Sequence, residues 1–298
     1  MKVLLFGRDG QVGRALVDAL APKVNLHSLG RRDVDFTEPA RVTALLRNAQ
    51  PDIVINAVAH TAVDKAEVER ELAHLVNAYT PAMIGRSAAE CGAWLIHYST
   101  DYVFDGEKDG PYTEEDPTAP LNVYGTTKRD GEIGIAESGA RHLIFRLGWI
   151  HSTGANNFIS KILRRAQALD EFDVVEDQIG APTSARLIAH VTARALLEIE
   201  HGRLEDSGVY HLVAAGETSW NDYARFVIDE AHKRGIPVRA TPDRIRRVPS
   251  SSSPGVARRP RNSRLSTEKL RAQLKIDLPD WQGGVRQTMA DLAPEFVR

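Results

Sequence analysis

The chain has 298 residues, 42% of them hydrophobic, a formal net charge of −2 and a single cysteine. This length allows one large domain or two moderate ones. The nearly balanced charge argues against proteins that bind nucleic acid or membrane surfaces, and the lone Cys91 excludes an internal disulfide. The N-terminus reaches glycine too early for a signal peptide, and no apolar run is long enough to cross a membrane. We therefore expect a cytoplasmic protein.

A glycine-rich turn follows the first predicted strand, residues 2–6. Gly7, Gly10 and Gly13 separate this strand from a helical pattern over residues 14–20. In such a turn the first glycine allows a tight bend, the second lets the backbone approach a pyrophosphate, and the third lets the helix pack on the strand. The helix then presents N–H groups to phosphate oxygens. The pattern predicts a dinucleotide site, with a turn that binds no ligand as the alternative.

The second predicted strand, residues 25–29, ends in Gly30, Arg31 and Arg32. Folds that bind NAD usually carry an acid here, which holds the adenosine ribose. Arginine would instead pair with the 2′-phosphate of NADP. The sequence therefore favours NADP(H) and leaves NAD(H) possible, with a solvated arginine pair as the alternative. Phe36 is a candidate for flanking the adenine.

The strongest candidates for chemistry are Thr100, Tyr124 and Lys128. Residues 93–98 form an apolar run of strand length, so Thr100 falls at the C-terminal end of a strand, where ligands bind in open α/β sheets. Tyr124 and Lys128 are four residues apart in a predicted helix and share one face. A neighbouring ammonium lowers the pKa of a phenol. The three groups suit proton delivery to a carbonyl that accepts hydride, and an exposed helix pair is the alternative.

Strands and helices alternate along the first half of the chain. Further strands are predicted at residues 52–56 and 142–147, and residues 63–89 read as a helix with a break near Thr80 and Pro81. This alternation predicts an α/β fold, a Rossmann-type doubly wound parallel sheet with a smaller C-terminal substrate domain. The pattern loosens after residue 147. We expect residues 1–147 and 178–214 to bind NADP(H), and residues 148–177 and 215–298 to bind substrate.

The stretch from residue 241 to residue 265 is rich in arginine. Its seven arginines are Arg244, Arg246, Arg247, Arg258, Arg259, Arg261 and Arg264. Bidentate guanidinium contacts suit a diphosphate, so this density indicates a local anion site. A solvated basic loop is an equal alternative.

Together these stretches resemble the extended short-chain dehydrogenase/reductase superfamily, and within it the dTDP-4-dehydrorhamnose reductase family over nearly the whole chain. Residues 97–104, 177–183 and 258–265 carry the specific part of the resemblance, whereas the glycine and Tyr/Lys motifs indicate only the superfamily. The resemblance implies reduction of the C4 ketone of dTDP-4-dehydro-β-L-rhamnose by hydride from NADPH. That reaction is the last step of dTDP-L-rhamnose synthesis.

The resemblance also implies roles for single residues. Tyr124 would be the general acid, Lys128 its partner and a holder of the nicotinamide ribose, and Thr100 the group that polarises the ketone. The cofactor residues would be Gly7, Gly10, Gln11, Val12, Gly13, Arg31, Arg32, Asp35, Phe36, Ala59, His60 and Thr61, together with Tyr124 and Lys128. The nucleotide-sugar residues would be Tyr98, Thr100, Asp101, Trp149, Arg259, Asn262 and Ser263.

One departure from the family concerns a metal. Some relatives form a metal-bridged dimer through acidic side chains at the positions of Ala15, Arg186 and Asp291. Two of these three residues are not acids here, and Arg186 would repel a cation. We therefore predict no metal site, doubtful Mg²⁺ binding, and a monomer or weak homodimer.

Two other functions fit the same fold. The regulatory subunit of methionine adenosyltransferase resembles this family and acts as a binding partner without catalysis, and nucleotide-sugar epimerases keep NAD tightly bound. The intact Thr100, Tyr124 and Lys128, together with residues 258–265, favour the reductase.

Overall fold

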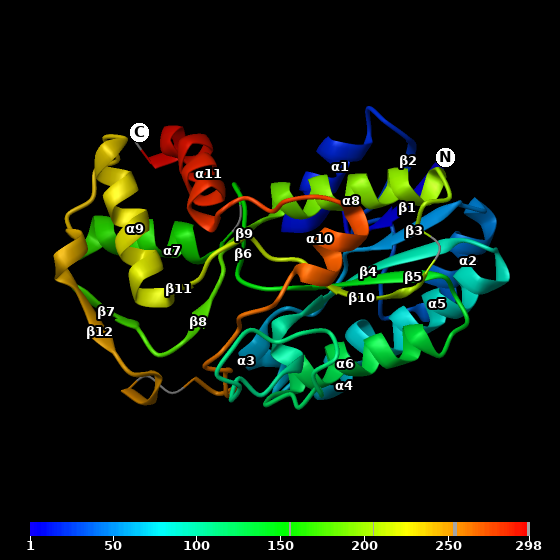
Figure 1. Ribbon diagram of the computed structural model, residues 1–298, viewed down its shortest axis with the longest axis horizontal. Coiled ribbons are helices and arrows are strands. Elements are labelled where there is room, and N and C mark those ends of the chain that lie inside the picture. The colour runs from blue at the N-terminus through cyan, green and yellow to red at the C-terminus, as the bar shows by residue number, and fades with distance from the viewer. Residues whose placement is uncertain (155, 205, 253–254, 297–298) are drawn as a thin grey trace.

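A six-stranded parallel sheet organises the larger part of this computed structural model, which describes residues 1–154, 156–204, 206–252 and 255–296 (Figure 1). The strand order is β10-β5-β4-β3-β1-β2, and each neighbouring pair is parallel. The predicted doubly wound parallel sheet is confirmed. Its strands are β1 (Lys2–Phe6), β2 (Asn25–Leu29), β3 (Ile53–Asn56), β4 (Trp94–Thr100), β5 (His142–Leu147) and β10 (Gly208–His211).

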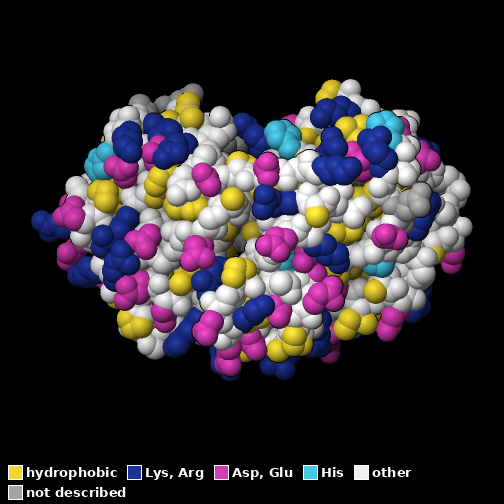
Figure 2. Space-filling view, in the orientation of Figure 1, with side chains coloured by type: hydrophobic (Ala, Val, Ile, Leu, Met, Phe, Trp, Pro, Cys, Tyr) yellow, Lys and Arg dark blue, Asp and Glu magenta, His cyan; other side chains and the backbone are white. Residues whose placement is uncertain are grey.

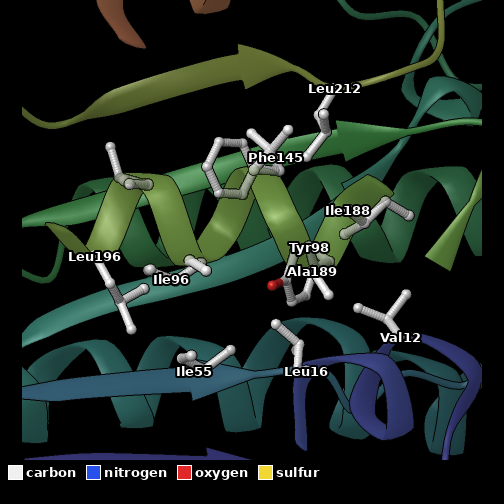
Figure 3. Packing of buried hydrophobic residues seen from close by; sticks show 14 of the residues in the cluster. Val12, Leu16, Ile55, Ile96, Tyr98, Phe145, Ile188, Ala189, Leu196 and Leu212 are labelled. Atoms are coloured by element: carbon white, nitrogen blue, oxygen red, sulfur yellow. The ribbon is translucent and has the colours of Figure 1, made fainter. Parts of the chain in front are cut away.

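Helices cover both faces of this sheet because its buried strands are apolar on both sides. On β1, Leu5 faces one core and Leu4 faces the other, as the alternation of a strand requires. The first core lies under α1 (Gln11–Leu20) and α8 (Ala185–Glu200), and Figure 3 shows Leu16, Ile188 and Phe145 among its buried side chains. The second core lies under α2 (Pro39–Ala49), α5 (Thr80–Glu90) and α6 (Val123–Ala136).

A smaller lobe follows the sheet and has a core of its own, built around Phe172, Tyr223 and Trp281. Figure 1 shows it beside the sheet, with its helices packed together. They are α7 (Phe158–Ala168), α9 (Trp220–Lys233) and α11 (Trp281–Phe296). Its short strands are β7 (Phe172–Val175) with β12 (Ile245–Val248), and β8 (Ile179–Gly180) with β11 (Thr218–Ser219). Between the lobes, β6 (Ile150–His151) pairs with β9 (Thr183–Ser184), and short 3₁₀ turns lie at η3 (Pro242–Arg244) and η4 (Ser250–Ser252).

One late helix returns to the first lobe. The helix α10 (Glu268–Leu274) buries Leu270 and Leu274 in the core under α8, and Leu278 follows them. The predicted division assigned residues 215–298 to the substrate domain, so the structure differs at this segment. Two apolar residues four positions apart share one face of a helix, but this spacing does not indicate which core that face will join.

The segment between β3 and β4 also differs from the prediction. The single helix expected over residues 63–89 is divided into α3 (Val63–Ala66), α4 (Arg70–His74), a π-helical turn η1 (Leu75–Tyr79) and α5. No break occurs at Thr80, because its N–H bonds to the carbonyl of Leu75 and the π turn leads directly into α5. Pro81 stands in the first turn of α5, where proline needs no N–H partner.

The surface shown in Figure 2 intersperses basic and acidic side chains, in keeping with the small net charge. Its outline is notched between the two lobes. Among the described residues, no helix combines the length and the apolar character needed to cross a bilayer.

Candidate active site

The turn between β1 and α1 has the geometry of a phosphate cradle. Gly7 adopts φ +94°, and a Cβ on Gly13 would lie 1.9 Å from the carbonyl oxygen of Gly7. Both positions therefore require glycine. Around Gly10 a Cβ would meet only the carbonyl oxygen of Gly7, at 3.5 Å, so the backbone there faces open space. Gly10 is also the N-cap of α1 and brings no side chain to cap its first N–H groups.

A cavity of about 290 Å³ extends from this turn toward the end of β2. Its lining includes Gly10, Arg31, Phe36 and His60. Phe36 is held edge-on against Phe6 with ring centres 5.5 Å apart, and Asp35, which also lines the cavity, accepts two hydrogen bonds from Thr37. The exposed Arg32 does not line this cavity.

Gly30 makes room for a carboxylate from another loop. A Cβ at Gly30 would lie 2.1 Å from Oδ2 of Asp9, so a side chain at position 30 would displace Asp9. The carboxylate of Asp9 accepts the backbone N–H of Arg31 at 3.0 Å. The end of the groove at β2 thus holds an acid beside Arg31, although position 30 itself has none.

A second cavity, of about 450 Å³, continues the groove along the ends of β1, β3 and β4. The predicted cofactor residues that line it are Gly10, Gln11, Val12, Ala59, Thr61, Tyr124 and Lys128. The side-chain oxygen of Gln11 accepts hydrogen bonds from Ser152 and Asn157, which belong to the connection into the smaller lobe. His60 lines the 290 Å³ cavity instead, and it is held there because its Nε2 lies 2.8 Å from Glu69 and its backbone N–H donates to Asn77.

Thr100 stands where β4 ends and the 3₁₀ turn η2 (Asp101–Val103) begins. Its hydroxyl donates to Oδ1 of Asp101 at 3.0 Å and accepts the N–H of Tyr102 at 3.2 Å. The phenol of Tyr124 reaches the same hydroxyl. The structure thus brings Thr100 and Tyr124 together, as the predicted proton-transfer site requires. Burial raises the pKa of Asp101 to about 6.

Lys128 lies one turn after Tyr124 but directs its Nζ at β4. The Nζ donates to the carbonyl oxygen of Tyr98 at 2.6 Å and lies 3.0 Å from Nε2 of His97. Burial raises the pKa of Tyr124 to about 12 and lowers that of Lys128 to about 8. The predicted lowering of the Tyr124 pKa by the ammonium is therefore wrong, because Nζ of Lys128 is engaged by Tyr98 and His97 and desolvation dominates.

The smaller lobe contributes a cavity of about 830 Å³ next to Tyr124. Tyr102, on its wall, meets the Tyr124 ring edge-on with centres 5.9 Å apart. The other lining residues include Leu121, Phe158, Gln178, Trp220, Arg258, Arg259 and Arg261. Arg258, Arg259 and Arg261 belong to the arginine-rich stretch, whereas Tyr102, Gln178 and Trp220 were not predicted as site residues. Tyr102 and Gln178 lie inside residues 97–104 and 177–183, which carry the family resemblance, and Trp220 had no such signal.

Trp149, between Gly148 and β6, adopts φ +46°, a left-handed conformation that is uncommon for a large side chain. Its ring stacks on Trp220 with centres 3.6 Å apart, and Gly180 leaves the space that the indole fills. The tertiary structure therefore joins Trp149 to the aromatic wall of the 830 Å³ cavity.

Tyr98 lies elsewhere than predicted. Its hydroxyl is 2.8 Å from Oγ1 of Thr192 on α8, and its ring stacks on Phe145, as Figure 3 shows beneath α8. Successive residues of β4 face opposite sides, so Tyr98 faces α8 while His97 faces α6. We therefore correct the assignment of Tyr98 to the sugar site: its phenol belongs to the core and only borders the 450 Å³ cavity.

Asn262 also differs from its predicted role. Its amide donates to the carbonyl oxygens of Lys108 and Gly110, and its oxygen accepts from Arg264. These bonds use the side chain inside the protein, where it holds the loop over residues 105–112 rather than a diphosphate. The hydroxyl of the neighbouring Ser263 hydrogen-bonds the carboxyl of Asp101 and lowers its pKa against the larger effect of burial.

Most arginines of the basic stretch are paired with carboxylates. Arg246 pairs with Asp173, Arg247 with Asp222, Arg259 with Asp64, and Arg264 with Glu217. Arg258, Arg259 and Arg261 line the 830 Å³ cavity, so only this part of the stretch adjoins a site of ligand size. Of the positions at which some relatives would carry metal-binding acids, Arg186 pairs with Asp291 at 2.9 Å.

Comparison with known proteins identifies the family to which the chain belongs. The family model described as "RmlD substrate binding domain" matches residues 1–293. A protein of Escherichia coli K12 named dTDP-4-dehydrorhamnose reductase is 48% identical over 98% of each chain. One of the same name from Burkholderia thailandensis is 41% identical over 98% of this chain and 99% of its own.

The chain belongs to the dTDP-4-dehydrorhamnose reductase family. Solved structures of that name share its fold. The structure from Clostridium acetobutylicum has a TM-score of 0.88 at 33% identity and covers 98% of this chain and 99% of its own. The dTDP-4-dehydrorhamnose reductase of Bacillus anthracis, in complex with NADP, has a TM-score of 0.87 at 28% identity and covers 98% and 100%.

Proposed function

We propose that the protein reduces the C4 ketone of dTDP-4-dehydro-β-L-rhamnose to give dTDP-L-rhamnose, with NADPH as the hydride source. The observation that carries this proposal is the position of Tyr124. Its phenol contacts Thr100, lines the groove that begins at the glycine turn, and lies edge-on to Tyr102 on the wall of the 830 Å³ cavity. A proton donor at that junction serves a hydride acceptor in the cavity and a dinucleotide in the groove.

The residues present fit a dinucleotide. Gly7 and Gly13 allow the tight turn, the open space at Gly10 admits a pyrophosphate, and α1 presents its N–H groups to it. Phe36 would flank the adenine, and Arg31 would meet a 2′-phosphate. The larger lobe thus binds the cofactor, and the smaller lobe with Arg258, Arg259 and Arg261 binds the nucleotide diphosphate.

The nicotinamide supplies a hydride to C4 of the sugar when it is bound. Tyr124 donates its proton to the C4 oxygen, so that ketone plus hydride plus proton gives the alcohol. With its pKa at about 12, the phenol is protonated at neutral pH and ready to act as an acid. Thr100 hydrogen-bonds the same oxygen, for which its hydroxyl must turn away from Asp101. Lys128 returns a proton to the phenolate.

The test is NADPH oxidation by the purified protein with dTDP-4-dehydrorhamnose. Tyr124→Phe is expected to lower kcat by about 100- to 10,000-fold, as loss of a general acid does. Tyr79→Phe is the matched control, because that tyrosine is half-exposed on η1 and should leave kcat unchanged. Full activity in Tyr124→Phe would contradict the assignment of the acid.

The two alternative functions give different results in the same assay. A regulatory subunit would bind nucleotide but show no turnover without a partner protein. An epimerase would keep NAD bound through purification, which its absorbance reveals, and would consume no cofactor.

A further inference from the structure

Three buried side chains from three elements lie in a row behind the proposed acid. Nε2 of His97 on β4 is 3.0 Å from Nζ of Lys128 on α6, and its Nδ1 is 3.2 Å from Nδ2 of Asn56 on β3. His97 is 0% exposed, and Asn56 and Lys128 are each 1% exposed. The contacts between them are therefore buried, although Lys128 also borders the 450 Å³ cavity, and the three side chains must satisfy one another.

The backbone determines which way the amide of Asn56 points. The N–H of Val58 donates to Oδ1 of Asn56 at 3.0 Å. If the amide were turned over, its NH₂ would face the N–H of Val58, and two donors would point at each other. Nδ2 therefore faces His97 and donates to Nδ1. Burial and the charge of Lys128 hold the pKa of His97 well below 6.5, so the ring is neutral and its one hydrogen lies on Nε2.

That hydrogen points at Nζ of Lys128. An ammonium has three donors and no lone pair, so it cannot accept a hydrogen bond, whereas an uncharged amine can. An amine also donates to the carbonyl oxygen of Tyr98, which lies 2.6 Å away. The hydrogen bonds of Asn56, His97 and Lys128 are thus all satisfied only when Lys128 is uncharged.

The charged groups around Lys128 do not change this conclusion. Glu132 on the same helix raises the pKa of Lys128, but less than burial lowers it, and the Glu132 carboxylate accepts hydrogen bonds from Arg146 of β5 at 2.7, 3.0 and 3.3 Å. From η2, the charge of Asp101 acts on Tyr124. On the other elements packed against α6, Asp64 pairs with Arg259, Glu69 pairs with His60, and Arg86 and Glu90 are exposed.

We propose that His97, held in one tautomer by Asn56, is a positioning residue that controls whether Lys128 carries a proton. A charged Lys128 needs an acceptor at Nε2, which places the ring hydrogen on Nδ1 against the NH₂ of Asn56. The two arrangements differ by one proton on Lys128 and by which ring nitrogen bears hydrogen. The arrangement with uncharged Lys128 and hydrogen on Nε2 is favoured, because it satisfies the buried hydrogen bonds. Lys128 therefore releases its proton readily. This inference rests on the proposed function, in which Lys128 returns a proton to Tyr124.

The first test needs no variant and no substrate. In ¹⁵N NMR of histidine-labelled wild-type protein, the His97 ring should show the Nε2–H tautomer at alkaline pH. It should move toward the Nδ1–H tautomer as the pH falls through the pKa of Lys128, about 8. An Nδ1–H tautomer at every pH, or a tautomer that does not change, would overturn the proposal. This readout also remains valid if the proposed reaction is not observed.

The second test is the pH profile of kcat. Activity should fall as the pH rises through the pKa of Lys128, because the amine has no proton to return. His97→Gln offers an oxygen acceptor to the ammonium, and Asn56→Asp accepts Nδ1–H. In both variants the alkaline limb of the kcat profile should shift to higher pH by about one unit or more. Lower kcat at every pH with an unmoved limb would show a merely structural role and overturn the proposal.

Discussion

At the residue scale, the proposed adenosine end of the groove contains both the positive charge of Arg31 and the negative charge of Asp9. The carboxylate of Asp9 accepts the backbone N–H of Arg31. Arg31→Ala should raise the KM for NADPH by about tenfold or more and leave that for NADH unchanged, because a charge-assisted bond to the 2′-phosphate is lost. Asp9→Ala should shift the preference further toward NADPH, since a carboxylate repels that phosphate. Arg32→Ala is the control, and an unchanged NADPH/NADH ratio in Arg31→Ala would contradict the argument.

Asp101 carries a stability cost that depends on pH. Burial raises its folded-state pKa from 3.8 to about 6, so the folded protein prefers the protonated carboxyl and loses stability as the pH rises between these values. Asp101→Asn should therefore gain about 2–3 kcal/mol in the free energy of unfolding at pH 8, and the gain should shrink toward pH 4. Denaturant titrations at several pH values measure this. The exposed Asp109→Asn should show no such trend; an equal gain at every pH would contradict the cause.

At the element scale, the approach of α6 to η2 depends on Gly125. A Cβ there would lie 2.1 Å from the carbonyl oxygen of Tyr102, so Gly125→Ala must push the helix away and carry Tyr124 from Thr100. A displacement of about 1 Å is expected to lower kcat about 100-fold. Steady-state kinetics test this, with a folded protein confirmed by circular dichroism.

Gly283→Ala is the matched control for that variant. Gly283 lies in α11, and a Cβ there meets nothing within 4 Å. The substitution should keep the activity and stabilise the protein by about 0.5–1 kcal/mol, through helix propensity alone. Wild-type kcat in Gly125→Ala would show that the contact with η2 does not position the acid.

At the scale of the whole molecule, the ion pair of Arg186 with Asp291 ties α8 to α11 at the place where relatives are expected to bind a metal. We expect gel filtration to give the same elution volume with Mg²⁺ and with a chelator. Ala15→Glu combined with Arg186→Glu restores the missing acids and should make elution depend on Mg²⁺. A Mg²⁺-dependent dimer of the wild-type protein would contradict this prediction.

The amino-acid sequence alone predicted the architecture and pointed to candidate reacting groups. The alternation of apolar strands and helices is a local pattern, and it predicted the parallel sheet because buried parallel strands need helices on both faces. Gly7, Gly10 and Gly13 identified the turn, because backbone geometry there admits only certain residues. The spacing of Tyr124 and Lys128 placed both on one helix face. Residues 97–104, 177–183 and 258–265 indicated the family.

The tertiary structure decided what each of these groups touches. The side of β4 that faces α8 was not visible in the sequence, so Tyr98 was assigned to the sugar site although it belongs to the core. The partner of Lys128 is His97 from a strand 31 positions earlier, and Asn262 serves a loop 152–154 positions away. Such contacts arise from packing between distant segments, and local periodicity carries no information about them.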